Sequence, residues 1–350
     1  MKTATPSIRS ISVGEPIYVP DNSGDTWSPA WTPDGEIYSP SNDTKGFHLA
    51  GKGNVMFNRI DGAQPTKLTG ETVNTMATYG DHAEEGPDIC SWKTSGCTSI
   101  DGALYLLVAR HQYGEKSGDA TRRQIARNAS FIRSTDKGRT WGRSAQENYD
   151  RPMFPGQRFG APFFVNYGQD GREAVADGSD RYLYALSNNG FWDNGDDMVL
   201  GRVLRSQMPR LKGEDWQYLR GEDGSLDASW SSAMSEARPV LSNPNHLGST
   251  GTTYLPAQKC YLLIAWYYPL GGGKMPGASV ETCWDFYTAP HPWGPWNKVG
   301  SHRFKPEGFY CPSVCPKFTS EDGSTVWVMT AGDWNNEAVY RLTAMPLTLV

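Results

Sequence analysis

Residues 101–106 read Asp-Gly-Ala-Leu-Tyr-Leu, a tight turn that leads directly into an apolar strand. The same order of turn and strand returns four more times along the chain. The five copies lie 63 to 79 residues apart and begin at Asp34, Asp101, Asp180, Lys259 and Asp322. Self-similarity at this spacing indicates a fold built from repeats, and five copies of about 72 residues account for the 350 residues of the chain.

Each copy has the same internal order of strands. A first strand precedes the turn, and we expect these strands at 28–32, 97–100, 161–167, 252–255 and 313–318. A third strand follows the apolar one, at 55–60, 129–134, 198–205, 282–289 and 338–343. A fourth, outer strand is visible in some copies, as at 216–219. The pattern predicts an all-β fold, a five-bladed β-propeller with four-stranded antiparallel blades.

No linker marks a domain boundary, so residues 1–350 are expected to form a single propeller domain. The segment 8–19 would close the ring by completing the last blade. The only helical candidate is a short amphipathic stretch near 120–127. The five predicted blades span approximately 20–75, 88–145, 155–222, 236–300 and 305–350.

One local motif agrees with this fold. Residues 134–141 read Ser-Thr-Asp-Lys-Gly-Arg-Thr-Trp and fit the pattern Ser-x-Asp-x-Gly-x-Thr-Trp at every fixed position. The motif resembles the Asp boxes that lie between outer strands of sialidase and related propellers. We expect Asp136 and Gly138 to build a turn and Trp141 to pack between strands, a structural role that says little about activity.

The composition excludes some functions and leaves the state of the cysteines open. A net charge of −5 argues against a general affinity for nucleic acid. No apolar run approaches the roughly 20 residues that span a bilayer. Without a paired CxxC motif, structural zinc is not expected. The six cysteines are either buried thiols or partners in disulfides, for which the candidates are Cys260 with Cys283 and Cys90 with Cys97.

Strand polarity gathers polar and aromatic residues on one rim of the predicted propeller. The start of a first strand and the end of the antiparallel second strand lie on the same face. The 190–197 loop either binds a ligand on this rim or packs over the mouth of the channel. Carboxylates, amides and aromatic rings together can grip hydroxyl groups and stack on sugar rings. The predicted substrate-binding residues are Trp27, Lys93, Arg110, Tyr113, Arg158, Asn189, Trp192, Asp193, Tyr267, Tyr310 and Asp333.

Two hypotheses for catalysis arise at this rim. Asp25 and Asp43 lie at opposite ends of one hairpin, and two carboxylates that flank a glycosidic bond are the usual machinery of its hydrolysis. An acidic run at 81–88 could instead supply the proton donor. His111 or Tyr113 could alternatively act as the base of a polysaccharide lyase, with Lys93 and Arg158 neutralising a uronic acid.

The first repeat also carries a family resemblance. It contains, in order, Asp25-Thr-Trp27, Trp31-x-x-Asp34-Gly-x-x-Tyr38 and Asn42-Asp43. These motifs resemble the first blade of the five-bladed propeller family that includes endo-D-arabinanases, and the resemblance implies that Asp25 and Asp43 are the catalytic pair. The specific motifs cover only this blade. The Arg110-His111 element departs from the pattern of this family. The lyase hypothesis therefore stays open, because propeller lyases that act on rhamnose–glucuronate linkages are similar in architecture.

The sequence therefore predicts a glycoside hydrolase with Asp25, Asp43 and His111 as catalytic candidates. A lyase and a non-catalytic sugar-binding propeller are the alternatives. The expected partner is a polysaccharide or oligosaccharide substrate. We expect the protein to be a monomer that binds neither nucleic acid nor a membrane. No cofactor is required, although a calcium ion in the channel is compatible with the pattern. Because such substrates lie outside the cytoplasm and residues 1–10 lack a signal-peptide pattern, we expect a secreted or periplasmic protein whose signal was removed.

Overall fold

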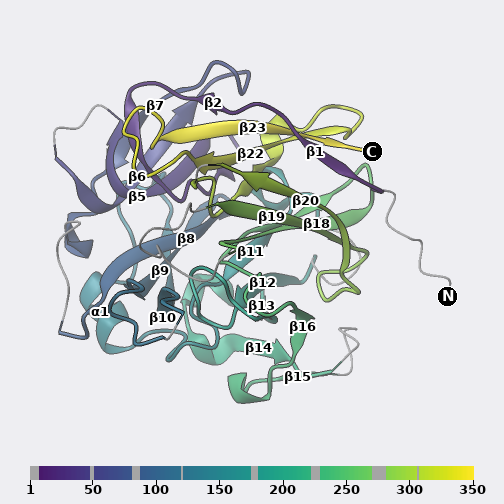
Figure 1. The fold of residues 1–350 in the computed structure, drawn as a ribbon. Coiled ribbons are helices and arrows are strands. Elements are labelled where there is room, and N and C mark those ends of the chain that lie inside the picture. The colour runs from purple at the N-terminus through teal and green to yellow at the C-terminus, as the bar shows by residue number, and fades with distance from the viewer. Residues whose placement is uncertain are drawn as a thin grey trace.

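The computed structural model describes residues 8–47, 51–80, 87–119, 121–174, 180–221, 229–269, 281–305 and 307–350. Within these ranges the chain is almost entirely β-structure, with one α-helix, α1 (Ala145–Asp150), and short 3-10 turns (Figure 1). The strands of these ranges fall into five successive groups of antiparallel neighbours.

The first two groups come from the N-terminal half of the chain. The first contains β3 (Asn22–Asp25), β4 (Ala30–Trp31), β5 (Ile37–Phe47), β6 (Gly53–Asp61) and β7 (Thr69–Asn74). The second contains β8 (Ser91–Ile100), β9 (Ala103–Gln112) and β10 (Ile125–Ser134).

The third and fourth groups form one sheet, because β11 and β17 pair in parallel. The third contains β11 (Phe163–Asn166), β12 (Tyr182–Asn188), β13 (Asp197–Leu204), β14 (Trp216–Leu219), β15 (Trp230–Ser231) and β16 (Pro239–Ser242). The fourth contains β17 (Thr252–Leu255), β18 (Cys260–Tyr267), β19 (Thr282–Ala289) and β20 (Asn297–Phe304).

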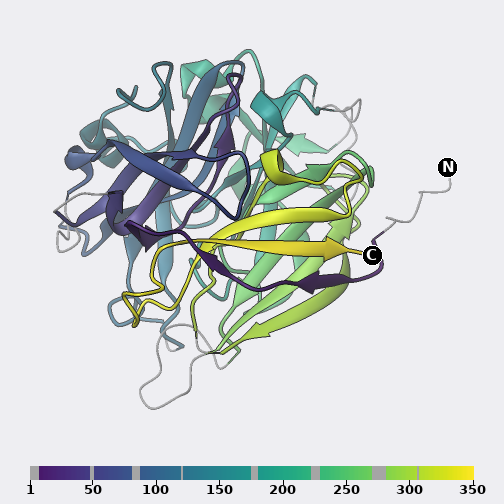
Figure 2. The same ribbon diagram turned by 90° about the horizontal axis from the view of Figure 1, so that it is seen from above.

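The fifth group joins the two ends of the chain. Strand β23 pairs with β22 and also with the N-terminal strands β1 and β2, as the adjacent purple and yellow ribbons of Figure 2 show. The N-terminal segment therefore adds two short strands to this sheet. The group contains β21 (Ser313–Cys315), β22 (Thr325–Ala331), β23 (Leu342–Leu349), β1 (Ile11–Val13) and β2 (Ile17–Tyr18).

The five groups contact one another in a closed cycle. Strand β5 contacts β8, β8 contacts β11, β11 pairs with β17, β17 contacts β21, and β22 contacts β3. Apolar clusters fill the junctions between the groups. Between the second and third groups, for example, the ring of Trp216 lies 5.7 Å from that of Phe131 and 5.2 Å from that of Phe154.

Two sequence predictions of secondary structure were wrong. The predicted helix near 120–127 is absent, because Ile125–Ser134 form β10 and the α-helix lies at Ala145–Asp150. The predicted third strand at 338–343 lies instead at Leu342–Leu349. The residues before it form turns, in which the amide of Asn336 donates to the carbonyl of Asp333 and Val339 donates to Asn336.

Residues 134–141 form a compact turn at the end of β10. The Oδ1 atom of Asp136 accepts the backbone N–H of Thr140 at 2.9 Å, and the N–H of Gly138 donates to Oγ of Ser134 at 2.8 Å. Gly138 has a φ of +84°, and a Cβ atom there would lie 2.2 Å from the ring of Phe57. The Trp141 ring packs edge-on against Phe57 of the first group at 4.8 Å, so the turn ties the two groups together.

The six cysteines are free and buried. The structure therefore decides between the two alternatives that the sequence left open, in favour of thiols that pack as small apolar side chains. Neither candidate disulfide, Cys260 with Cys283 or Cys90 with Cys97, is formed.

Candidate active site

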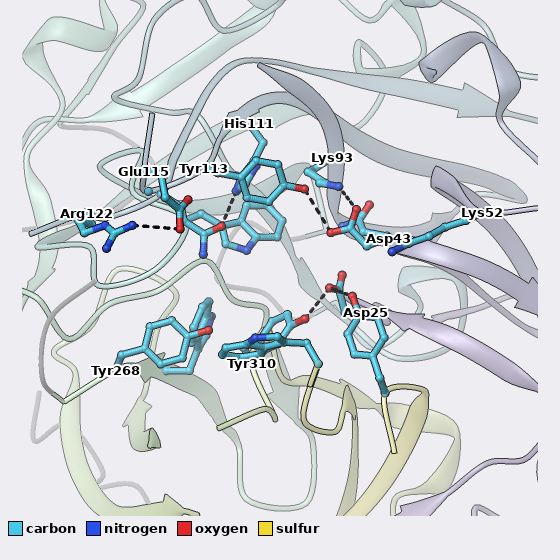
Figure 3. Close-up of a pocket in the computed structure, with 17 residues that line it drawn as sticks. Asp25, Asp43, Lys52, Lys93, His111, Tyr113, Glu115, Arg122, Tyr268 and Tyr310 are labelled. Atoms are coloured by element: carbon cyan, nitrogen blue, oxygen red, sulfur yellow. Dashed lines mark hydrogen bonds and ion pairs between the residues drawn. The ribbon is translucent and has the colours of Figure 1, made fainter. Parts of the chain in front are cut away.

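All five strand groups contribute side chains to a cavity of about 330 Å³ (Figure 3). The cavity lies where second strands end and third strands begin, which is the rim that strand polarity selected. The structure brings together seven of the residues predicted from the sequence: Asp25, Asp43, Lys93, His111, Tyr113, Trp192 and Tyr310.

The two aspartates reach the cavity from one irregular hairpin. Asp25 ends β3 and lies opposite Asn42 of β5, the residue before Asp43, and the pairing register shifts between Ser23 and Asp25. Asp43 itself has a φ of +48°, a left-handed conformation that Asp tolerates better than most residues. Bulges of this kind redirect side chains. Figure 3 shows Asp25 and Asp43 both directed into the pocket.

Asp25 is buried and surrounded by hydroxyl donors. The hydroxyls of Tyr310 and Tyr340 each donate to its Oδ2 atom at 2.5 Å, and Thr26 donates to Oδ1 at 2.8 Å. Burial raises the pKa of Asp25, and repulsion from Asp43 raises it further, while the tyrosine hydrogen bonds oppose both effects. The net rise favours the protonated acid.

Asp43 has a cation as its partner. Lys93 is 3% exposed and its Nζ forms an ion pair with Oδ1 of Asp43. Burial alone would lower the pKa of Lys93, but attraction to Asp43 outweighs it and the pKa is raised. The Tyr113 hydroxyl lies 3.4 Å from the other oxygen of Asp43. The Lys93 ammonium group therefore favours the carboxylate form of Asp43, whereas the surroundings of Asp25 favour its neutral form.

His111 is held in its neutral form. Burial and the nearby Lys93 lower its pKa to about 3, although Asp43 and a hydrogen bond to Gln124 oppose this. Its Nε2 lies 2.8 Å from Oε1 of Gln124. The ring meets those of Tyr113 and Trp192 edge-on, at 4.8 and 5.4 Å between centroids.

Aromatic rings from the fourth and fifth groups form another side of the cavity. The Trp266 ring lies 5.3 Å from Tyr268 and 5.6 Å from Tyr310, and Trp334 lies 6.0 Å from Tyr268 and 5.6 Å from Tyr310. In Figure 3, Tyr268 and Tyr310 lie on the side opposite His111 and Tyr113. Such a surface can stack on the apolar face of a sugar ring.

Two predicted binding residues are held away from the cavity by their own partners. Trp27 is fully buried, donates to the carbonyl of Gly24 at 2.9 Å and packs against Phe47. Arg110 alternates with His111 along β9 and forms a two-point ion pair with Asp88, at 2.8 and 3.1 Å.

The remaining predicted residues also lie outside the cavity lining. Asn189 bonds to Asp196 at 3.2 Å, and Arg158 donates to the carbonyl of Ala237. Asp193 is buried and accepts the backbone N–H of Gln124 at 2.7 Å, so it supports the lining from behind. The other two are Tyr267, which packs on His246 at 4.2 Å, and Asp333, which accepts the N–H of Asn335 at 2.8 Å.

The acidic run considered as a proton donor is partly outside the described residues, which leave out Asp81, His82, Glu84 and Glu85. Asp88 is described, and its ion pair with Arg110 outweighs partial burial and lowers its pKa. Asp88 is therefore a carboxylate held away from the cavity.

Sequence reasoning missed several lining residues that share one origin. Trp266 lies near the end of β18, a second strand. The others lie in the connections between a second and a third strand. Those connections start where second strands end, so the rim argument could have included them, but they carry no periodic pattern. The missed residues are Lys52, Gly114, Glu115, Arg122, Gln124, Trp266, Tyr268 and Tyr340.

The described residues contain neither a metal-ligand cluster nor a helix fit to span a membrane. No group of three or more His, Cys, Asp or Glu side chains there is arranged to hold a metal ion. None of the helices in the described ranges has the length and apolar composition that a membrane span requires.

No protein-family model matches the chain, and no curated protein matches its sequence. Solved structures do resemble it. An inferred hydrolase from Bacteroides ovatus aligns over 93% of this chain and 85% of its own, with 14% identity and a TM-score of 0.51. This likeness shows a shared fold, so the chain has the nearly all-β fold of that hydrolase.

Two glycoside hydrolases align less closely. A GH62 hydrolase in complex with xylotriose aligns over 97% of this chain and 98% of its own, with 11% identity and a TM-score of 0.47. The RS223 β-xylosidase aligns over 96% of this chain and 94% of its own, with 12% identity and a TM-score of 0.45.

Proposed function

We propose that this chain is a glycoside hydrolase that cleaves a polysaccharide or oligosaccharide in the cavity. One observation carries the proposal: two aspartates from a single hairpin enter an aromatic-lined pocket, where the surroundings of one favour its neutral form and those of the other favour its charged form. Pairs of carboxyl groups whose environments differ in this way divide the acid and base roles between them.

The roles follow from those environments. Asp25, whose pKa is raised, donates its proton to the oxygen of the leaving sugar. Asp43, kept anionic by Lys93, acts on the other side of the bond, either directly on the anomeric carbon or through a water molecule. The aromatic side, with Tyr268 and Trp334, would hold the sugar ring next to the scissile bond.

We also propose that the fold is a five-bladed propeller. The closed cycle of contacts among five strand groups supports it, as does the pairing of β1 and β2 with β23. The resemblance of the first repeat to endo-D-arabinanases makes D-arabinan the first substrate to test. A monomeric, secreted or periplasmic enzyme fits this role.

The geometry favours hydrolysis over elimination. A lyase needs a base near a cation that neutralises the uronate. His111, with a pKa lowered to about 3, is a weak base, and burial raises the pKa of Tyr113 to about 12, which makes that phenol hard to deprotonate. Lys93 is occupied by Asp43, and Arg158 lies outside the cavity lining.

The products of the reaction test the proposal. The protein would be incubated with D-arabinan, L-arabinan, xylan and uronic-acid polysaccharides. New reducing ends without ultraviolet absorbance support hydrolysis, and an absorbing unsaturated uronate would instead establish a lyase. Binding of a polysaccharide without new reducing ends would identify a sugar-binding protein.

A further inference from the structure

Gln124 lines the cavity, and its side chain is held at one end. Its Oε1 lies 2.8 Å from Nε2 of His111, and within the described ranges its amide nitrogen has no hydrogen bond to the protein. Its main chain is fixed on both sides, because its N–H donates to Asp193 at 2.7 Å and its carbonyl accepts the N–H of Trp192 at 2.7 Å. The side chain of Gln124 is therefore held through its Oε1 atom, and among the described residues its amide nitrogen keeps its N–H groups for a ligand.

The proton of His111 determines which way this amide points. The imidazole is 2% exposed, it lies close to Lys93 and Asp43, and its pKa of about 3 means that it carries a single proton at neutral pH. An acceptor, Oε1 of Gln124, faces Nε2, whereas Nδ1 has no partner in the described part of the chain. A buried lone pair without a donor is tolerated better than a buried N–H without an acceptor, so the proton belongs on Nε2.

We infer that His111 is a positioning residue that orients Gln124, and that the amide of Gln124 donates an N–H group to an acceptor oxygen of the sugar, a hydroxyl or ring oxygen. The inference rests on the proposed function. It gives His111 a role without proton transfer, in contrast to the catalytic role that its place beside Tyr113 suggested. It also gives the buried Asp193 an indirect part, as the anchor of Gln124.

Substitutions of Gln124 test the contact with the sugar. Gln124→Met keeps the size of the side chain and removes both donors, so kcat/KM on the panel polysaccharide that wild type cleaves fastest should fall by about 5- to 100-fold. A second variant, Gln124→Glu, replaces the amide with a carboxylate. Its control is Gln146→Glu, on the exposed side of α1, which should change kcat/KM by less than about twofold. Unchanged kcat/KM in Gln124→Met would overturn the inference.

The tautomer of His111 tests the positioning role without any turnover. With ¹⁵N-labelled histidine, long-range ¹H–¹⁵N spectra should show a protonated Nε2 and an unprotonated Nδ1 between pH 5 and 8. In Gln124→Glu the introduced carboxylate should raise the midpoint of protonation of His111 by at least about one pH unit. A proton on Nδ1, or an unmoved midpoint, would overturn the positioning role. If no polysaccharide is cleaved, the proposed function fails. The spectra still test the positioning role of His111, because they need no turnover.

Discussion

Asp25 and Asp43 come from one hairpin and one residue type, yet their surroundings differ in kind. Three neutral hydroxyls surround Asp25, two of them from tyrosines of the fifth strand group. A buried ammonium group from the second strand group faces Asp43. The comparison teaches that one residue type on one hairpin can meet opposite surroundings: burial and repulsion from Asp43 favour the neutral form of Asp25, whereas the packed ammonium group favours the charged form of Asp43.

Removing either carboxyl group should have the largest effect. Asp25→Asn removes the proposed acid and Asp43→Asn removes the proposed base or nucleophile, so kcat should fall by about 10²- to 10⁴-fold in each variant. Initial rates of reducing-end release measure the loss. Full activity in either variant would remove that residue from the catalytic pair.

The two variants should differ in stability, which sharpens the comparison. Asn resembles a protonated Asp, so Asp25→Asn should change the free energy of unfolding by less than about 1 kcal/mol. Asp43→Asn leaves Lys93 buried without its carboxylate, which should cost about 3–5 kcal/mol. Urea denaturation at neutral pH measures both values.

A matched pair of lysines provides the control for this prediction. Lys93→Met breaks the buried ion pair from the other side and should also cost about 3–5 kcal/mol. Lys137→Met breaks the exposed pair with Asp34, for which about 0–1 kcal/mol is expected. Equal losses in the two variants would contradict the distinction between the buried and the exposed pair.

The aromatic side should affect binding more than chemistry. Trp334 is half-buried and packs on Tyr268 and Tyr310. Trp334→Ala should raise KM by about 3- to 30-fold and leave kcat within about threefold, while Trp334→Phe should restore most of the affinity. A fall in kcat at unchanged KM would show that Trp334 acts through Tyr310 on Asp25 and not on the sugar.

The smallest expected effect lies in the pH profile. The Tyr340 hydroxyl opposes the rise in the pKa of Asp25, so Tyr340→Phe should raise that pKa further. If the acid form of Asp25 is the active one, as proposed, the alkaline limb of the pH–kcat/KM profile should move upward by about one pH unit or less. An acidic limb that moves upward, with an unmoved alkaline limb, would instead mean that Asp25 works as an anion.

The strand pattern was predictable where the signal was local. The five apolar second strands and most first and third strands lie within a few residues of their expected positions, because turn residues and apolar runs specify them directly. The outer strands β7 and β20 were not predicted individually. Their sequences, Thr-Gly-Glu-Thr-Val-Asn and Asn-Lys-Val-Gly-Ser-His-Arg-Phe, are mostly polar, and their residues are half-buried or exposed except for Phe304, so they carry little apolar signal.

The candidate site was predictable only in part. The rim argument located Asp25, Asp43 and His111, because strand polarity decides which ends meet. It placed Arg110 with His111, although neighbouring residues on a strand point to opposite faces. It also placed Trp27 at the rim, where the positive φ of Thr26 (57°) redirects the chain and Trp27 enters the core.

The sequence by itself determined the repeat, the strand order and the pair of aspartates on one hairpin, because these depend on neighbours along the chain. Only the tertiary structure brought Lys93 to Asp43, and Tyr310 and Tyr340 to Asp25, across 50, 285 and 315 residues. Protonation depends on burial and on the charges and donors within a few ångströms. The proposed division of roles between the two aspartates therefore depends on the folded chain.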